Sequence, residues 1–586
     1  MLTIVPKKEF IPKPFKKNMS DQTFFSIKIG GQAGQGIKSA GLTLSKVATR
    51  SGFNIHTYTE FPSLIRGGHN VEQILISRED ISTPLQKTDL LIALNQDTIN
   101  KHAAELLPGS GAMFDADKRI DTSKLVTGVN LYPVPLSKLA GLELLINTVA
   151  LGATIALLGG KVDLLYDLIR LEYSDKGEEL ISKNISAAKS GYDFVRQSFA
   201  DQLNTVLASL EKIEQKMIVN GAEAVALGAI AGGLQFASIY PMSPISGILQ
   251  ALAVHQEKYG YIYKQPEDEI AALTMAIGAG FAGARSMTAT SGGGFCLMTE
   301  GLGLAAMTET PVVIINGMRP GPATGLPSWS GQGDLQFILH AHQGTIPRIV
   351  LAAGDGLDAF NLTMKALNLA QKYQTPVILL IDKNICDDDQ SYPVFDISGY
   401  QLNSGKFTTD FNPNFARYAQ EEDGISYRTI PGTGNFFIAN SDEHLEAGFS
   451  TEESADVVMQ ADKRMRKQAT CEKEDMQPPE LFGPASAEIT LVSWGSNKNN
   501  ILHAIRDTIG VNYLHITWMS PFPTAAVKDV LGKAKHIIDI ECNSTGQLAE
   551  LIAEKTGILI TDKLLKYDGR PIYPEEIITK LNSSNV

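Results

Sequence analysis

Five short, almost wholly apolar runs between residues 237 and 381 constrain the fold of this chain more than any other feature. Strands that are apolar along their whole length suit a parallel sheet covered by helices on both faces. The segments between the runs are rich in Ala and Gly and are expected to be helical. The pattern predicts an α/β fold with doubly wound, mostly parallel sheets. The five predicted strands are 237–240, 285–290, 311–316, 348–352 and 376–381.

A chain of 586 residues is expected to hold about three such units, because one domain usually has on the order of 100 to 200 residues. The composition changes at residues 401–484, which are rich in Asn, Gly, Pro and charged residues. We interpret this stretch as an excursion between two domains. The predicted parts are a disordered arm at 1–20, a domain at 21–201, a charged helical connector at 202–215, a domain at 216–400, the partly helical excursion at 401–484 and a domain at 485–586.

Charge and cysteine content exclude several classes of function. The formal net charge of −13 argues against binding to nucleic acid or to an anionic membrane surface, since both need a positive field. The four cysteines include no CxxC pair, which argues against a disulfide framework and against an all-cysteine iron–sulfur cluster in this chain. Cys296 and Cys386 are expected to be small core residues. No apolar run reaches the ~18 residues of a membrane helix, so we expect a cytoplasmic protein.

A glycine-rich turn at residues 30–36 follows a predicted strand at 24–29 and precedes a predicted helix at 37–51. Free backbone N–H groups and the helix dipole at such a turn can hold an anion. Equally, the glycines can serve a tight strand-to-helix turn that needs positive φ angles. The candidate anion-binding residues are Gly31, Gly34 and Gly36, with Arg66 from the polar loop at 60–70.

Four further motifs lie in loops of the second predicted domain, next to its predicted strands. Ligands of open α/β sheets bind at the carboxyl ends of the strands, so we expect these loops to converge on one site. The motifs are Tyr240-Pro241-Met242-Ser243-Pro244, Glu267-Asp268-Glu269-Ile270-Ala271-Ala272, Ser291-Gly292-Gly293-Gly294, and the Gly- and Pro-rich loop from Arg319 to Ser328.

Together these motifs resemble the α subunit of the 2-oxoacid:ferredoxin oxidoreductases, most closely those of the 2-oxoglutarate type. Residues 23–200 resemble the γ subunit of the same enzymes, here fused ahead of α. The resemblance implies a γ-like domain, a thiamine diphosphate pyrimidine-binding-type domain and a transketolase C-terminal-like domain. It also implies oxidative decarboxylation of a 2-oxoacid, 2-oxoglutarate by preference, to CO2 and an acyl-coenzyme A. Thiamine diphosphate would be the cofactor and coenzyme A the co-substrate.

The resemblance assigns roles within the motifs. Glu269 would be the catalytic carboxylate that bonds N1′ of the cofactor's aminopyrimidine, although it can also be read as a carboxylate favoured by a helix N-terminus. Ser243, Arg319 and Ser328 would bind the substrate, with the planar fork of Arg319 on a carboxylate. Taken alone, Ser243 could instead cap a helix, and Arg319 could be a solvated surface residue. The turn at 30–36 and Arg66 would lie on the coenzyme A side. Expected cofactor contacts are Tyr240, Pro241, Glu269, Ser291 and Gly292.

A second glycine motif, Gly354-Asp355-Gly356 followed by Asn384, looks like a magnesium and diphosphate site. The span from Glu269 to Asn384 is too short for two complete α/β domains, so we expect Asp355 to open a helix and no metal site in this chain. The resemblance instead implies a β subunit that holds Mg2+, the diphosphate and a [4Fe-4S] cluster, with ferredoxin as acceptor and an (αβ)2 heterotetramer. Residues 543–547 resemble another family segment and are expected to start a helix with a capping Ser or Thr.

Three alternatives stay open at this point. The substrate could be pyruvate or another 2-oxoacid, because no residue identifies a binder for a second carboxylate. The turn at 30–36 could belong to a nicotinamide-binding dehydrogenase, which requires an acidic residue ~20 residues further on, where only Glu60 stands. The chain could also be a non-catalytic scaffold that keeps the fold without the chemistry.

Overall fold

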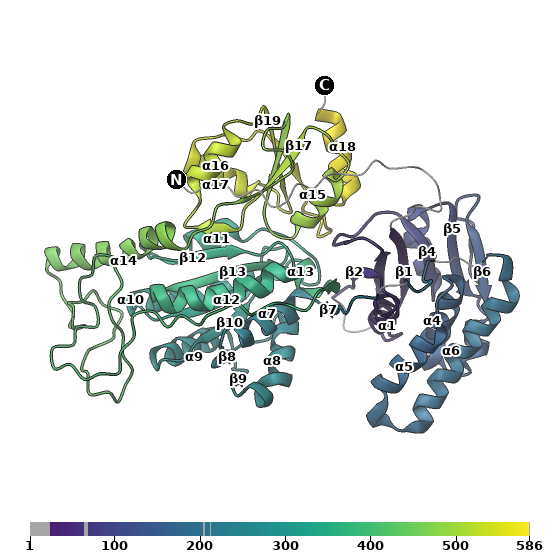
Figure 1. The fold of residues 1–586 in the computed structure, drawn as a ribbon, viewed down its shortest axis with the longest axis horizontal. Helices are drawn as coiled ribbons and strands as arrows, with labels where there is room; N and C mark the ends of the chain where they lie inside the picture. The colour runs from purple at the N-terminus through teal and green to yellow at the C-terminus, as the bar shows by residue number, and fades with distance from the viewer. Residues whose placement is uncertain (1–23, 64–67, 203–205, 211–212, 585–586) are drawn as a thin grey trace.

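The computed structural model describes residues 24–63, 68–202, 206–210 and 213–584, which form three α/β units, each built on one sheet (Figure 1). The predicted arm at 1–20 and Arg66 lie outside the described residues. The first unit lies on the right of Figure 1, the second at the centre and left, and the third above the second. No described helix is both long enough and apolar enough to cross a bilayer.

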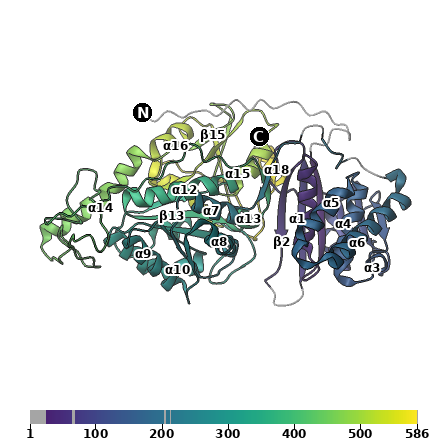
Figure 2. The same ribbon diagram turned by 60° about the horizontal axis from the view of Figure 1, so that its bottom comes forward.

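The first sheet is mixed rather than mostly parallel. Its strands are β1 (Phe24–Gln32), β2 (Asn54–Glu60), β3 (His69–Ser77), β4 (Thr88–Ala93), β5 (Leu106–Asp115), β6 (Asn130–Val134), β7 (Met217–Val219) and β14 (Gln390–Tyr392). The strand order is β6-β5-β4-β1-β3-β2-β14-β7, and only β6, β5, β4 and β1 pair in parallel. β3 runs antiparallel between β1 and β2. The helices of this unit include α1 (Ile37–Arg50), α4 (Ile146–Leu157), α5 (Val162–Glu172) and α6 (Glu178–Ser198). In Figure 2, α4, α5 and α6 lie away from the second unit.

Two short strands of the first sheet, β7 and β14, come from parts of the chain that follow the first predicted domain. β14 pairs antiparallel with both β2 and β7. The Thr57 N–H donates a 2.8 Å hydrogen bond to the Asp389 carbonyl, and the Ile55 N–H donates a 2.9 Å bond to Ser391 Oγ. Backbone pairing therefore joins the first unit to the second. The predicted helix of the connector is wrong at its described residues 206–210 and 213–215, which are turns and irregular backbone.

The second sheet is parallel except at one edge. Its strands are β8 (Phe236–Ser238), β9 (Ile262–Lys264), β10 (Ser286–Thr290), β11 (Val312–Met318), β12 (Ile349–Ala352), β13 (Pro376–Asp382) and β18 (Trp518–Ser520). The order is β18-β12-β13-β11-β10-β8-β9, with only β18 antiparallel to its neighbour. The chain leaves β8 for β9 at one edge and leaves β10 for β11 in the other direction. The gap between β8 and β10 is thus a topological switch point, where open α/β sheets bind ligands.

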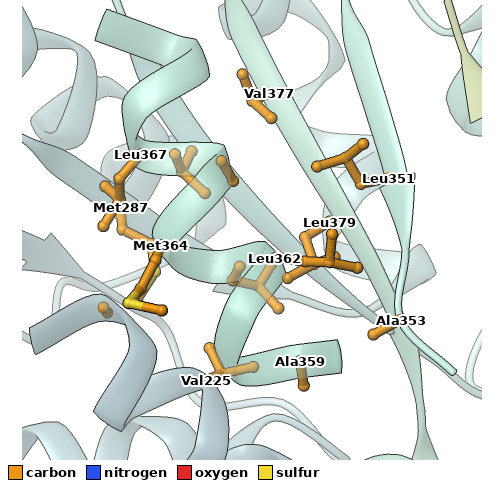
Figure 3. Close-up of a cluster of buried hydrophobic side chains, with 14 of the residues drawn as sticks. Val225, Met287, Leu351, Ala353, Ala359, Leu362, Met364, Leu367, Val377 and Leu379 are labelled. Atoms are coloured by element: carbon orange, nitrogen blue, oxygen red, sulfur yellow. The ribbon is translucent and has the colours of Figure 1, made fainter. Parts of the chain in front are cut away.

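Helices cover both faces of the second sheet, as the apolar strands predict. They are α7 (Gly221–Ala231), α8 (Ser246–Tyr259), α9 (Glu269–Phe281), α10 (Gly292–Met307), α11 (Leu335–His340), α12 (Gly356–Tyr373) and α13 (Lys383–Asp387). Leu362, Met364 and Leu367 of α12 pack with Met287 and Val377 of the sheet in one buried cluster (Figure 3). α9 and α10 contribute to a second cluster on the other face.

The excursion carries one long helix, α14 (Ser454–Glu474), which a buried ion cluster anchors to the second unit. The carboxylate of Glu309, just beyond α10, lies 2.6 Å from Lys463 Nζ and 2.5 Å from Lys467 Nζ. Arg417 Nη2 donates a 2.6 Å hydrogen bond to the Glu309 carbonyl. Burial opposes ionisation of Glu309, but the three cations hold its pKa well below the usual range. Burial lowers the pKa of Lys467 to about 7, although Glu309 opposes this shift.

The third sheet is smaller and supports the C-terminal helices. Its strands are β15 (Glu480–Phe482), β16 (Ile489–Ser493), β17 (Val511–His515), β19 (His536–Glu541) and β20 (Asp562–Leu565). The order is β15-β17-β16-β19-β20, parallel except at β15. β18 leaves this unit to pair with β12, which joins the third unit to the second. The helices are α15 (Asn497–Ile505), α16 (Thr524–Leu531), α17 (Gln547–Thr556) and α18 (Pro574–Ser584).

The start of α17 differs from its prediction. The N-cap is Gly546, with a φ of 76°, and neither Ser544 nor Thr545 caps the helix. The buried Glu541 carboxylate accepts hydrogen bonds from the Leu548 and Ala549 N–H groups at 2.8 and 3.3 Å. A charged acceptor at a helix N-terminus is stronger than a hydroxyl, so the predicted Ser or Thr cap is wrong.

Candidate functional site

Three of the predicted loops meet at the switch point of the second sheet. The loop at 240–244 follows β8, the turn at 291–294 follows β10 and the loop at 319–334 follows β11. Arg319 Nη1 donates a 2.9 Å hydrogen bond to the Ser243 carbonyl, which ties the first loop to the third. A Cβ on Gly293 would lie 3.9 Å from the Ala323 carbonyl, so the turn faces the third loop. The three loops therefore lie close together, as expected from strands that end at one edge of the sheet.

Glu269 is the first residue of α9 and is 4% exposed. Its carboxyl group packs against Gly294, where an added Cβ would lie 2.7 Å from Glu269 Oε1 and would also collide with Thr290 Oγ1. Its neighbour Asp268 caps the helix instead, because Asp268 Oδ1 accepts a 2.7 Å hydrogen bond from the Ala271 N–H. Glu267 is exposed. The structure therefore gives the capping role to Asp268 and directs Glu269 towards the start of α10.

The start of α10 is a backbone-rich cradle. Ser291 is its N-cap and does not cap it with its side chain; the buried Ser291 Oγ has no hydrogen-bond partner among the described residues. The next three residues are glycines, and a Cβ on Gly292 would collide with the carboxylate of Asp334. Asn316 Nδ2 donates a 3.1 Å hydrogen bond to Asp334. Burial raises the pKa of Asp334, which the Asn316 bond and the charge of Arg319 partly offset.

Two clefts open on either side of the loop at 319–334. The first cleft, of about 490 Å³, lies between the first and second units; Lys38 and Phe61 line it on one side and Ser243, His255 and Pro327 on the other. The second cleft, of about 650 Å³, lies between the second and third units. Its lining includes Ser291, Gly292, Arg319, Asp334, Asn543, Thr545 and Tyr567. The two predicted substrate ligands Ser243 and Arg319 thus lie in contact but line different clefts.

Several other predicted site residues do not line either cleft or do not have the role predicted for them. Ser328 is buried, its Oγ has no partner within the described part of the chain, and it lines neither cleft. Tyr240 and Pro241 lie in the loop after β8 but line neither cleft. Ser243 does not cap a helix, because α8 begins at Ser246 after Ile245. Cys296 is exposed in the second cleft, so its predicted core position is wrong, whereas Cys386 is buried.

The turn at 30–36 serves the fold of the first unit. Gly34 and Gly36 have φ angles of 91° and 67°, so the tight-turn interpretation is confirmed for them. A Cβ on Gly31 would lie 2.5 Å from Gln35 Oε1. None of the three glycines lines either cleft, whereas Lys38 does line the first cleft. In the sequence, Lys38 stands out only as a cation two residues after the last glycine of the turn.

The topology excludes the dinucleotide-binding interpretation of this turn. In such folds the second strand pairs directly with the first, and its terminal acidic residue reaches the ribose. Here β3 lies between β1 and β2, and Glu60 ends β2 two strands away from the glycine turn. The nicotinamide alternative is therefore wrong.

The Gly354-Asp355-Gly356 motif is a helix start, as predicted. Asp355 Oδ1 accepts a 2.8 Å hydrogen bond from the Asp358 N–H at the start of α12. Lys498 of the third unit lies 3.0 Å from Asp355 and 2.7 Å from Asp358, so an ammonium group already neutralises these carboxylates. Across the described ranges, no group of three or more His, Cys, Asp and Glu side chains is placed to hold a metal ion.

Comparison with known proteins identifies relatives over nearly the whole chain. Residues 227–464 match the family model described as pyruvate flavodoxin/ferredoxin oxidoreductase, thiamine diP-bdg, and residues 26–194 match pyruvate ferredoxin/flavodoxin oxidoreductase. The 2-oxoacid:ferredoxin oxidoreductase subunit alpha of Saccharolobus solfataricus is 32% identical, over 94% of this chain and 96% of that protein. The 2-oxoglutarate oxidoreductase subunit KorA of Mycobacterium tuberculosis is 29% identical, over 94% and 90%.

A solved structure shares the whole fold. It is the 2-oxoglutarate:ferredoxin oxidoreductase from Magnetococcus marinus with 2-oxoglutarate, coenzyme A and succinyl-CoA bound. The two chains superpose with a TM-score of 0.90 at 31% sequence identity, over 96% of this chain and 100% of that one.

Proposed function

This chain belongs to the 2-oxoacid:ferredoxin oxidoreductase family as an α subunit, and from that premise we propose that it oxidatively decarboxylates 2-oxoglutarate to CO2 and succinyl-coenzyme A. Two electrons would leave through a partner β subunit to ferredoxin. The observation that carries the proposal is the buried Glu269 directed at the glycine cradle of α10 at the switch point of the sheet. The choice of 2-oxoglutarate as substrate is supported by two relatives, the 2-oxoglutarate oxidoreductase subunit of Mycobacterium tuberculosis and the Magnetococcus marinus enzyme with 2-oxoglutarate bound.

The residues of this site fit the aminopyrimidine of thiamine diphosphate. Glu269 offers a buried carboxyl group, and Ser291 offers a buried hydroxyl without a partner among the described residues. Because Gly292 and Gly294 have no side chains, Asp334 and Glu269 can approach the backbone at the start of α10. When bound, the cofactor supplies a carbanion-type nucleophile for the 2-oxo carbon. Glu269 would hold and move the proton at ring atom N1′. A carboxyl group within hydrogen-bonding reach of a ring nitrogen is well suited to that task.

Arg319 would orient the substrate at this site. Its guanidinium group is fixed on one side by the Ser243 carbonyl, which leaves the opposite N–H groups of the planar fork available for a carboxylate. Ser243, whose carbonyl accepts this bond, lines the first cleft, and its hydroxyl would be a second group for the substrate. Lys38 in that cleft offers an ammonium group for the phosphates of coenzyme A, so the γ-like unit would close the coenzyme A side. We expect Ser328, Tyr240 and Pro241, which line neither cleft, to support the conformation of the loops that carry Ser243 and Arg319.

The outer faces of α9 and α10 indicate where a partner binds. Apart from Glu269 and Glu300 these helices carry no charged residue, and helices that are apolar all round are normally buried. In this chain, however, Ile270, Met275 and Leu297 are 52%, 39% and 51% exposed. An exposed apolar face beside a catalytic carboxyl group marks an interface. We assign it to the β subunit, which would bring Mg2+, the diphosphate site and a [4Fe-4S] cluster in a cytoplasmic (αβ)2 assembly.

Ile270→Asp is expected to prevent capture of the β subunit, because it would bury an unpaired charge in the proposed interface. The measurement is co-purification of the partner with a tagged α chain, together with the thermal unfolding of the α chain alone. Leu171→Asp on α5 is the matched control, since Leu171 is 65% exposed and lies on the first unit. Equal partner capture by both variants would place the β subunit elsewhere.

The decisive experiment for the function uses the complete complex isolated from its source. We expect reduction of a low-potential dye that requires both coenzyme A and a 2-oxoacid, fastest with 2-oxoglutarate. Pyruvate in place of 2-oxoglutarate tests the substrate. Recovery of the chain without a cysteine-rich partner, without thiamine diphosphate and without reduction would contradict the proposal and favour a scaffold.

A further inference from the structure

The loop at 319–334 carries Arg319 but has little structure of its own. It contains no helix or strand before α11 begins at Leu335, and much of it is Gly and Pro. Its shape must therefore come from the surfaces on which it lies. The third unit provides one of these surfaces, and the residue that engages it is Gln332, which no family motif singled out.

Gln332 is fully buried and makes five hydrogen bonds, all to the third unit. Its Oε1 accepts from the Cys542 N–H at 2.9 Å and from Asn497 Nδ2 at 2.8 Å. Its Nε2 donates to the Trp494 carbonyl at 3.0 Å. Its backbone N–H donates to the Cys542 carbonyl at 2.8 Å, and its carbonyl accepts from Asn543 Nδ2 at 3.2 Å. A buried side chain whose polar atoms all have hydrogen-bond partners is firmly fixed.

The partners of Gln332 belong to rigid elements. Trp494 and Cys542 directly follow β16 and β19, and Asn497 starts α15, so Gln332 is held at the carboxyl ends of two neighbouring strands. Nearby contacts add to this attachment. The Ser330 N–H donates a 3.0 Å hydrogen bond to the Gly569 carbonyl, and the Arg570 guanidinium lies 4.0 Å from the Trp329 ring centroid.

A direct packing chain connects Gln332 to the substrate arginine. Its neighbour Gly331 lies against Pro320, where an added Cβ would be 3.1 Å from the Pro320 nitrogen. Pro320 is bonded to Arg319. On the other side, Asp334 lies two residues beyond Gln332 and acts on Arg319 through its charge. Fixing Gln332 therefore fixes both the backbone and the charge environment of Arg319.

We propose that Gln332 is a positioning residue through which the third unit sets the place of Arg319 for the carboxylate of the 2-oxoacid. This inference rests on the proposed function. It assigns to the third unit a part in substrate binding, which the site residues alone do not give it. Gln332 lies on the side of the loop that faces the third unit and the second cleft. Its loss should therefore leave the binding of coenzyme A at the first cleft unchanged.

The test is Gln332→Ala in the complete complex with its β subunit. We expect the KM for 2-oxoglutarate to rise about tenfold, the size of a coupling within one hydrogen-bonded network, with the KM for coenzyme A unchanged. The same substitution in an Arg319→Ala background should change the KM for 2-oxoglutarate less than about twofold, because a residue that acts through Arg319 has nothing left to position. A merely structural residue would not show this loss of effect.

Gln336→Ala is the matched control. Gln336 on α11 also bonds to the third unit, by two 3.1 Å hydrogen bonds with Gln547, but it lies beyond the loop. If Gln332→Ala and Gln336→Ala raise the KM equally, or if Gln332→Ala adds its full effect to Arg319→Ala, the proposal is wrong. Should Gln332→Ala not fold, Asn497→Ala removes one bond to Oε1 and must reproduce a smaller, selective rise. An inactive wild-type complex would refute the proposed function itself. The variants test only the role of Gln332 and leave the proposed function standing.

Discussion

Glu269→Gln is expected to lower kcat/KM of the assembled enzyme by about 10²- to 10⁴-fold, the usual contribution of a positioned acid or base. The amide keeps the shape of the side chain against Gly294, but it cannot take up and return a proton. Binding of the 2-oxoacid by Arg319 should persist, so the loss should fall mainly on kcat. The measurement is coenzyme A-dependent dye reduction by the complex, with partner capture measured in parallel.

Glu267→Gln is the matched control for this experiment. Glu267 lies two residues earlier in the same acidic motif but is exposed, so its loss should leave kcat/KM within about twofold, as for most surface substitutions. If Glu269→Gln behaved like Glu267→Gln while the wild-type complex was active, Glu269 would not be the catalytic carboxylate. The scaffold interpretation of this chain would then gain support.

Glu309→Gln is expected to destabilise the second unit by about 3 to 5 kcal/mol, because it leaves two lysine ammonium groups buried without a counter-charge. Lys463 and Lys467 lie at 0% and 1% side-chain exposure and contact the same carboxylate. The loss should loosen α14 and the excursion from the body of the molecule. Thermal unfolding of the purified chain measures it, with a midpoint lower by on the order of 10 °C.

Glu300→Gln, on the helix that precedes Glu309, provides the comparison. Glu300 is exposed on the outer face of α10, so its substitution should change the free energy of unfolding by less than about 0.5 kcal/mol. A midpoint for Glu309→Gln as high as that for Glu300→Gln would mean that the two lysines lose their protons or find other acceptors. The Glu309 cluster would then not be what holds α14 in place.

The main strands could be predicted from the sequence because each is an uninterrupted run of apolar residues. The predicted strand at 376–381 became β13 (Pro376–Asp382), and the one at 311–316 became β11, two residues longer at its end. An uninterrupted apolar run can be read locally, since each of its residues faces a covered side of the sheet. The meeting of the loops at 240–244 and 291–294 followed as well, because parallel strands end at the same edge.

Short strands and long-range contacts could not be found in this way. β7, β14 and β18 have three residues each, and they exist because a partner strand far along the chain pairs with them. The same holds for Lys38, which reaches the first cleft only because β14 brings the second unit against the first. No local pattern marks such residues, because the energy that places them comes from contacts between units.

The sequence by itself therefore determined the α/β class, the order of most elements and the motifs that carry the family resemblance. Only the tertiary structure decided which acid of Glu267-Asp268-Glu269 caps α9 and which is buried, because that choice depends on the space left by Gly294 on another helix. It alone also revealed that Gln332 ties the substrate loop to the third unit, since the four residues to which it bonds lie more than 150 residues further along the chain.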